Sequence, residues 1–97
     1  SDLTVENNLT VSNNISAVNF TSTGTGVAII DSATTITLSA PDGTLISSGT
    51  LRLANLTTTQ RNALTPQNGD LIYNTTDSKL QGYQNSAWIN LDDGSAA

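Results

Sequence analysis

Cysteine, histidine and methionine are absent from the 97-residue chain, and only Arg52, Arg61 and Lys79 are positively charged. Without cysteine there are no disulfide bonds, thiolate nucleophiles or cysteine-based metal sites. Without histidine the chain lacks the commonest general base and the commonest transition-metal ligand. Three cations, within a net charge of −5, are too few to follow a phosphate backbone or an anionic membrane surface. We therefore expect no nucleic acid partner.

The chain also lacks an apolar run of about 18 residues, so we expect no insertion into a membrane. Apolar residues make up 36% and charged residues 11% of the chain, which are both low shares for a globular protein. Ser, Thr, Asn and Gln instead supply 42 residues. The high content of β-branched residues, Thr above all, favours β structure over disorder. Because the chain starts with Ser1 rather than Met, we expect it to be a piece of a longer protein.

Carboxylates are the remaining candidates for catalysis. Glycoside cleavage requires two facing carboxylates, and the spacing of the eight acidic residues suggests no such pair. Asp92-Asp93-Gly94 faintly resembles a calcium-binding sequence, but a calcium site needs six or more converging oxygens, so we interpret this stretch as a linker. We therefore predict no enzyme activity, no catalytic residue, no cofactor and no metal site.

A six-residue repeat opens the chain. Residues 3–8 (LTVENN) and 9–14 (LTVSNN) are nearly identical, and residues 15–20 (ISAVNF) form a decayed third copy. Apolar and polar residues alternate at the start of each copy, which is typical of a short strand with one apolar face. The Asn pair that follows favours a turn. Each copy is therefore predicted to be a short strand followed by a turn or kink.

The apolar positions of this repeat are in phase, which indicates a shared seam. One copy cannot bury its apolar face alone, so it must stack on the next copy or on another chain. Three copies are too few for a self-sufficient coil, so we favour interleaved chains over a left-handed single-chain β-helix. Three copies of the chain around an axis would bury each thin apolar stripe. The residues predicted to line this trimer seam are Leu3, Val5, Leu9, Val11 and Ile15.

The rest of the N-terminal half continues the pattern less regularly. Short strands are predicted at residues 27–30 (VAII), 33–40 (ATTITLSA) and 44–46 (TLI), with a turn at 41–43 (PDG). No helical period is present. Residues 1–50 are therefore predicted to form a repetitive β-shaft segment.

Residues 51–97 differ in sequence pattern from residues 1–50. They are predicted to form a second unit, a small β-meander module with one short helix and a C-terminal linker. The helix is predicted within residues 57–64 (TTTQRNAL). Thr57 and Gln60 have the spacing of a capping box, and Pro66 prevents the helix from continuing.

Strands are predicted on both sides of this helix. Residues 51–56 (LRLANL) alternate before it, and three strands follow at 70–74 (DLIYN), 79–84 (KLQGYQ) and 87–91 (AWINL). A turn cluster separates the first two of these three strands, and the two-residue turn Asn-Ser separates the last two. This order predicts a three-stranded antiparallel meander.

Each meander strand carries one aromatic residue: Tyr73, Tyr83 and Trp88. With a single Phe elsewhere, these are the largest residues available for a core, and we interpret them as the local core of the sheet. The alternative is a platform for a sugar, because aromatic faces bind apolar surfaces. The three residues are therefore also the candidates for receptor or glycan contacts.

The C-terminal half resembles a module common in tail-fibre and other structural proteins of phages, which also appears in surface proteins of some bacteria. The resemblance covers a leucine-rich lead-in, a Thr-Gln-Arg helix start and a Pro/Gly turn. It continues through residues 71–75 (LIYNT), 79–83 (KLQGY) and 87–88 (AW). The LTVENN-LTVSNN lead is similar to fibre-shaft repeats. The module marks architecture more than activity, because it occurs in proteins with different roles.

We therefore expect a mainly β protein, with a fibrous trimeric β-shaft of interleaved short strands followed by a small antiparallel β-meander with one short helix. The resemblance implies a non-enzymatic structural segment of a homotrimeric viral (phage) tail fibre that connects or presents the host-attachment part. Its partners would be its own copies, neighbouring fibre or baseplate proteins and a host surface glycan, at an extracellular position on the virion. The alternative is a monomeric carbohydrate-binding β domain of a bacterial surface protein.

Overall fold

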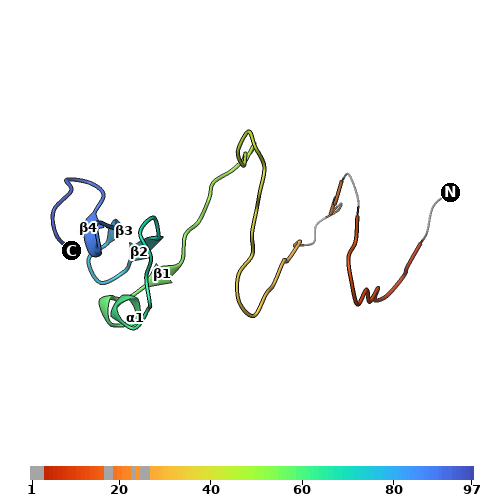
Figure 1. The fold of residues 1–97 in the computed structure, drawn as a ribbon, viewed down its shortest axis with the longest axis horizontal. Helices are drawn as coiled ribbons and strands as arrows, with labels where there is room; N and C mark the ends of the chain where they lie inside the picture. Colours follow the sequence, from red (N-terminus) through yellow and green to blue (C-terminus); the bar gives the residue numbers. More distant parts are fainter. Residues whose placement is uncertain (1–3, 17–18, 23, 25–26) are drawn as a thin grey trace. The chain divides into compact units, whose positions relative to one another are not determined.

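The structure, a computed structural model, describes residues 4–16, 19–22, 24 and 27–97. The chain divides into two compact units, Ser1–Ala40 and Pro41–Ala97. Every helix and strand of the described residues lies in the second unit (Figure 1). Residue 50, the predicted end of the shaft segment, also lies in the second unit.

In the first unit, residues 4–16, 19–22, 24 and 27–40 contain neither helix nor strand. The strands predicted at 27–30 and 33–40 are therefore not formed in the single chain, and the same holds for 44–46 in the second unit. A strand requires a partner for its backbone hydrogen bonds, and one isolated copy supplies none here. The interleaved trimer that would supply such partners stays a prediction.

The kinks expected in the six-residue repeat are present. The chain bends at residues 6–7 and again at residues 12–13, at equivalent places in the first two copies. Both bends fall where an Asn follows the alternating residues, and Asn tolerates turn conformations. The repeat in the sequence is therefore matched by a repeat in the path of the backbone.

The second unit is built on one four-stranded mixed sheet. In chain order its elements are β1 (Asn55–Leu56), α1 (Thr58–Asn62), β2 (Leu71–Asn74), β3 (Lys79–Gln84) and β4 (Ala87–Asn90). The strands lie side by side in the order β1-β2-β3-β4. β2, β3 and β4 pair antiparallel, which confirms the predicted meander. β1 pairs parallel to β2, an arrangement that the sequence pattern does not predict.

The capping box predicted at the start of α1 is confirmed. Thr57 Oγ1 accepts a hydrogen bond from the Gln60 backbone N (3.2 Å), and Gln60 Oε1 accepts one from the Thr57 backbone N (2.9 Å). These two bonds satisfy amides that have no partner within the helix. The helix ends at Asn62, shortly before Pro66, whose ring disfavours helical backbone in the residue before it.

The predicted two-residue turn between β3 and β4 is also confirmed. Asn85 and Ser86 have φ values of 52° and 61°, as a type I′ turn requires at both central positions. Between β2 and β3, Asn74 Oδ1 accepts hydrogen bonds from the backbone N of Thr76 (2.9 Å) and Asp77 (3.1 Å). These turns set the register of the meander.

The segment after β4, for which the sequence predicts a linker, folds back along the sheet. The Asn90 backbone N donates to Ser95 O (2.8 Å) and the Ala97 backbone N donates to Trp88 O (3.0 Å), so residues 95–97 pair with the outer edge of β4. Gly94, with φ of 76°, takes a left-handed conformation that glycine adopts without steric cost. The chain therefore reverses after β4 and covers that edge.

The strand register divides the sheet into two faces, because residues paired across antiparallel strands point to the same side. The face that contacts α1 is called the helix face and the opposite one the open face. The helix face carries Ile72, Asn74, Lys79, Gln81, Tyr83, Trp88 and Asn90. The open face carries Leu71, Tyr73, Leu80, Gly82, Gln84, Ala87 and Ile89, and Leu91 continues it beyond β4.

Candidate functional site

The interior of the second unit is mainly polar. Among the described residues, Ile72 is the one large apolar side chain that is fully buried, with 4% exposure. Asn74 and Gln81 have no exposed surface, and Arg61 is 6% exposed. Burying such groups costs free energy unless every one is hydrogen-bonded, so their partners decide whether this core is stable.

Gln81 lies at the centre of this polar core. Its Oε1 accepts hydrogen bonds from Arg61 Nη1 (2.9 Å) and Asn74 Nδ2 (3.0 Å). Its Nε2 donates to Asn90 Oδ1 (3.0 Å) and Asp77 Oδ2 (3.2 Å). One side chain on β3 therefore joins α1, β2, β4 and the turn after β2.

The remaining groups of the core are satisfied as well. Asn74 Nδ2 donates to Thr58 Oγ1 (3.0 Å), and Asn90 Nδ2 donates to Ser95 Oγ (3.1 Å). In the described part of the chain no buried side-chain nitrogen or oxygen lacks a partner. The network is thus closed on itself, as expected of a core that holds a fold rather than of a site that awaits a ligand.

The aromatic residues do not form one cluster. Tyr83 and Trp88 pair across β3 and β4 on the helix face, with ring centroids 5.2 Å apart and ring planes at 72°. The Arg61 guanidinium carbon lies 5.6 Å from the Trp88 ring centroid, at a distance where a cation is attracted to the ring face. Tyr73 pairs with Leu80 and so belongs to the open face. The single three-residue aromatic core that the sequence suggested is therefore wrong, because the register separates Tyr73 from the other two.

All three aromatic residues are half-buried, and the two rings on the helix face meet edge to face. They present no single flat three-ring surface of the kind that would suit a sugar. Their assignment as glycan contacts stays a prediction.

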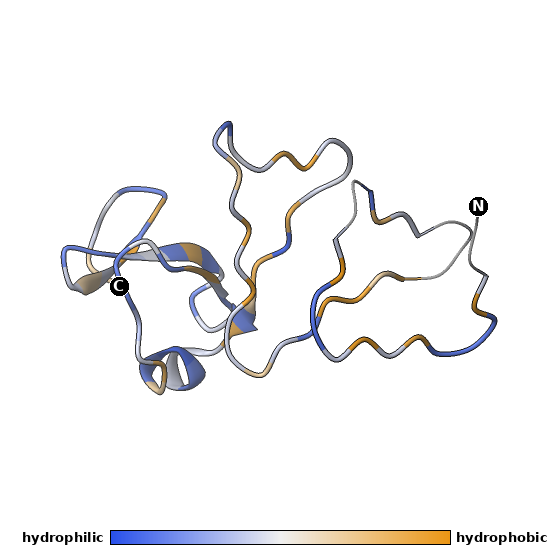
Figure 2. Ribbon diagram, turned by 45° about the vertical axis from the view of Figure 1, so that its right-hand side comes forward, coloured by the Kyte–Doolittle hydropathy of each residue, from blue (hydrophilic) through white to orange (hydrophobic). Residues whose placement is uncertain are grey.

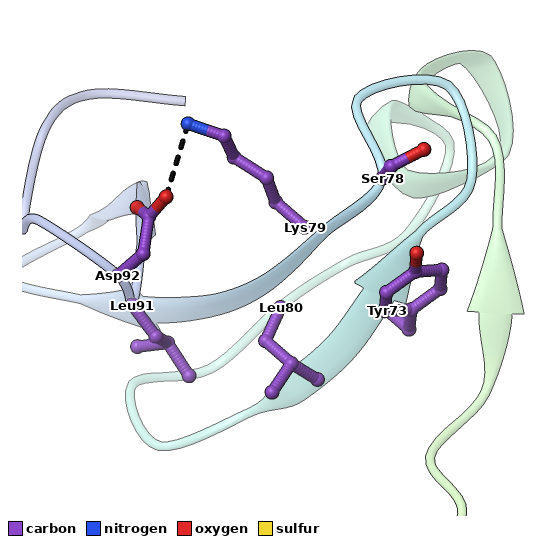
Figure 3. A pocket seen from close by; sticks show the side chains of 6 residues that line it. All are labelled: Tyr73, Ser78, Lys79, Leu80, Leu91 and Asp92. Atoms are coloured by element: carbon purple, nitrogen blue, oxygen red, sulfur yellow. Dashed lines mark ion pairs between the residues drawn. The ribbon is translucent and has the colours of Figure 1, made fainter.

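The open face is mostly apolar, and no helix or strand of the described residues covers it. Leu71 and Leu80 are each 49% exposed and Leu91 is 43% exposed. An open hollow of about 380 Å³ lies at one end of this face, lined by Tyr73, Leu80 and Leu91 and by Ser78, Lys79 and Asp92 (Figure 3). Lys79 Nζ and Asp92 Oδ2 form an ion pair (3.1 Å) at its rim.

The ion pair at the rim raises the pKa of Lys79, first through the hydrogen bond to Asp92 and then through the charge of the same carboxylate. Asp93 and Asp77 add smaller contributions of the same sign. Both side chains of the pair are well exposed, and exposed ion pairs contribute little to stability. The ion pair at the rim of the hollow therefore contributes little to the stability of the fold.

We predict that the fold-back after β4 responds to acid. Ser95 donates to Asp93 Oδ1 from Oγ (2.6 Å) and from its backbone N (2.9 Å), and these bonds lower the pKa of Asp93. Their stabilising effect is present above the ordinary pKa of 3.8 and is lost as the pH falls through the lower folded value. In a carboxyl NMR titration, Ser95→Ala should move the Asp93 midpoint upward, since the strongest donor is removed.

Ser47→Ala is the matched control, because this serine is exposed and the hydrogen bonds to Asp93 come from Ser95 instead. The Asp93 midpoint of this variant should equal that of the wild type. An unchanged midpoint in Ser95→Ala would show that Ser95 does not hold the carboxylate in solution.

The residues predicted to line a trimer seam are exposed in the single chain where the structure describes them. Val5 is 43%, Leu9 61%, Val11 42% and Ile15 54% exposed, and Leu3 lies outside the described residues. In the described part of the chain, these apolar side chains therefore keep at least 42% of their surface exposed. The seam between copies therefore stays a prediction.

Two further findings concern chemistry and membranes. The part of the chain that the structure describes holds no cluster of three or more acidic side chains suited to a metal ion. Its one helix, α1, has five residues, and none of the described helical structure could cross a membrane.

Comparison with known proteins adds no relative. No protein-family model, curated protein or solved structure matches the chain.

The sequence pattern alone misses the polar core. Asn74, Gln81 and Asn90 share the strand phase of Trp88, so alternation places them on one face. Their burial depends on α1 bringing Arg61 over that face. The signal available in the sequence was the recurrence of Asn and Gln at one phase of three successive strands.

Proposed function

We propose that this chain is a non-enzymatic structural segment of a homotrimeric viral tail fibre, of the phage type, that connects or presents the host-attachment part. The observation that carries the proposal is the exposure of the apolar residues in the six-residue repeat. Val5, Leu9, Val11 and Ile15 are between 42% and 61% exposed.

Apolar segments recur along the coil that precedes β1 (Figure 2), and they include Phe20, Ile29 and Ile30 at 76%, 80% and 75% exposure. Surface of this kind is buried when chains associate.

The six-residue repeat favours three copies around an axis. Its apolar positions form a thin stripe rather than a broad face, and a thin stripe is buried most fully when each copy meets its symmetry mates on two sides. The resemblance of the repeat and of the LIYNT…KLQGY…AW stretch to phage fibre modules supports a place in a tail fibre. It also supports an extracellular position on the virion, with neighbouring fibre or baseplate proteins as partners.

The alternative function, a carbohydrate-binding domain of a bacterial surface protein, requires a different oligomeric state and a different role for the aromatic residues. Such a domain would be monomeric, and Tyr73, Tyr83 and Trp88 would contact the sugar. In the fibre, a host glycan is a further partner, reached through the part that the segment presents.

Solution mass separates the two functions, and Leu9→Asp tests the seam. We expect the wild-type chain to have a mass of about 30 kDa by light scattering, three times the 10.1 kDa of one copy. Leu9→Asp should shift this mass toward one copy, because three carboxylates would enter an apolar seam without partners.

Thr10→Asp is the control, since strand alternation points Thr10 away from the seam, and it should keep the wild-type mass. If the wild-type chain is a monomer at micromolar concentration and its circular dichroism spectrum is that of a folded protein, the fibre assignment is contradicted. A Leu9→Asp variant that assembles and melts like the wild type would show that the repeat faces solvent.

A further inference from the structure

We propose that one end of the sheet, where the β3–β4 turn meets the loop before β2, is a covalent modification site at which Asn68 and then Asn85 deamidate. One hydrogen bond joins the two segments and slows the reaction at both positions. The inference is independent of the proposed fibre role, because it concerns contacts within the C-terminal unit of one copy.

Deamidation of an asparagine is a reaction of the chain with itself. The backbone nitrogen of the next residue attacks the side-chain Cγ and forms a C–N bond. Its proton passes to the departing amide nitrogen, which leaves as ammonia. Water then opens the cyclic imide at either carbonyl, which gives aspartate or isoaspartate, and no electron is transferred. The reaction is easiest before glycine, because no Cβ crowds the attacking nitrogen, and the small side chain of serine hinders it little.

Two dipeptides of this kind are in direct contact. Asn68-Gly69 precedes β2, and Asn85-Ser86 forms the turn between β3 and β4. Ser86 N donates a hydrogen bond to Asn68 Oδ1 (3.0 Å), across eighteen positions of the chain. All four residues are exposed, so the water that completes the reaction reaches both sites.

The fold holds both reacting groups of the first dipeptide. Gly69 N donates to Tyr83 O (2.7 Å), so its proton is engaged by the end of β3. The side-chain carbonyl of Asn68 is held against the turn by Ser86 N. Ring closure at Asn68 therefore requires these contacts to open, and the rate of the reaction follows the population of the opened state.

The bond from Ser86 to Asn68 protects the second dipeptide as well. Ser86 N is the nitrogen that attacks Asn85 Cγ, and its proton is engaged by Asn68 Oδ1. Aspartate at position 68 keeps an oxygen in this place. Isoaspartate there lengthens the main chain by one carbon and moves the carboxylate, which frees Ser86 N and exposes Asn85 to the same reaction. Asn68 reacts first because glycine follows it.

The few cations of the chain make the reaction easy to follow. In the denatured chain trypsin cleaves after Arg61 and Lys79, so Asn68 and Asn85 fall on separate peptides, residues 62–79 and 80–97. The full-length protein is incubated at mildly alkaline pH in native buffer or in urea, and mass spectrometry with fragmentation measures each asparagine. We expect Asn68 to convert at least about tenfold more slowly in native buffer than in urea, because only the opened chain reacts.

Asn68→Ala tests the shared bond. It removes the acceptor of Ser86 N, so the conversion rate of Asn85 in native buffer should rise at least about threefold. Asn68→Asp keeps an oxygen acceptor and should leave the Asn85 rate at the wild-type value. Gln67→Ala is the matched control with the same expectation, because Gln67 is exposed and bonds to Asp70 through its backbone.

Equal rates for Asn68 in native buffer and in urea, or no conversion of Asn68 in urea, would overturn the inference. An unchanged Asn85 rate in a folded Asn68→Ala variant would overturn it too, since the two sites would then share no bond. If Trp88 fluorescence shows that this variant is unfolded, hydrogen exchange of the Ser86 amide in the wild type decides instead. Exchange at least about tenfold slower than in the unfolded chain supports the inference, and unprotected exchange overturns it.

Discussion

Replacing Gln81 by Leu should unfold the C-terminal unit. The leucine fills a similar space but removes all four hydrogen bonds that Gln81 makes with Arg61, Asn74, Asn90 and Asp77. Arg61 Nη1 and Asn90 Oδ1 would then be buried without these partners. Leaving a buried charge and a buried carbonyl without hydrogen-bond partners costs about 3–5 kcal/mol in total. This cost is comparable to the entire stability of a small domain.

Chemical denaturation followed by the fluorescence of Trp88, the only tryptophan, measures this loss. Gln84→Leu is the matched control, because Gln84 ends the same strand but is exposed. It should change the free energy of unfolding by less than about 0.5 kcal/mol. Equal midpoints for the two variants would show that the buried network contributes nothing to stability.

Truncating Trp88 to alanine should destabilise the same unit for a different reason. The ring packs at a steep angle against Tyr83 and lies beneath the Arg61 guanidinium, so its loss opens a space beside a buried cation. Because Trp88 is half-buried, we expect about 2–4 kcal/mol, somewhat below the usual cost for a fully buried Trp. Trp88→Phe keeps an aromatic face under Arg61 and should recover much of the loss.

Fluorescence of the wild-type protein tests the same assignment before any substitution. A structural Trp88 should emit to the blue of free tryptophan and be quenched poorly by acrylamide, because Tyr83 and Arg61 shield two sides of the ring. Emission close to that of free tryptophan, ready quenching and a change on adding glycan would overturn the structural role. That result would instead favour the carbohydrate-binding alternative.

Most secondary structure of the C-terminal unit follows from signals that span only a few residues. The capping box needs only Thr57 and Gln60, three positions apart, and the Asn85-Ser86 turn needs two residues that tolerate positive φ. Alternation over four to six residues locates β2, β3 and β4. These elements are therefore predicted correctly, since their causes lie within the segments themselves.

The arrangement of the site depends on contacts between distant residues and is not predicted. Arg61 reaches Gln81 twenty positions further along the chain only because β1 pairs parallel with β2 and α1 crosses over the sheet between them. The alternation of β2 cannot show that Tyr73 and Trp88 fall on opposite faces, since that depends on how β3 joins the two strands. The fold-back of residues 95–97 likewise depends on a free edge of β4 that the sequence does not reveal.

By itself, the sequence determined which catalytic and metal-binding side chains are missing and where the turns and the repeat lie. The absence of cysteine and histidine, the six-residue repeat and the turn residues can each be recognised without knowing what lies nearby. Only the tertiary structure decided that the buried face of the sheet would be the polar one and that the leucine face would stay open. The physical reason is that Arg61, Asn74, Gln81 and Asn90 can be buried only when all their hydrogen bonds are made together, and α1 completes those bonds on one face of the sheet alone.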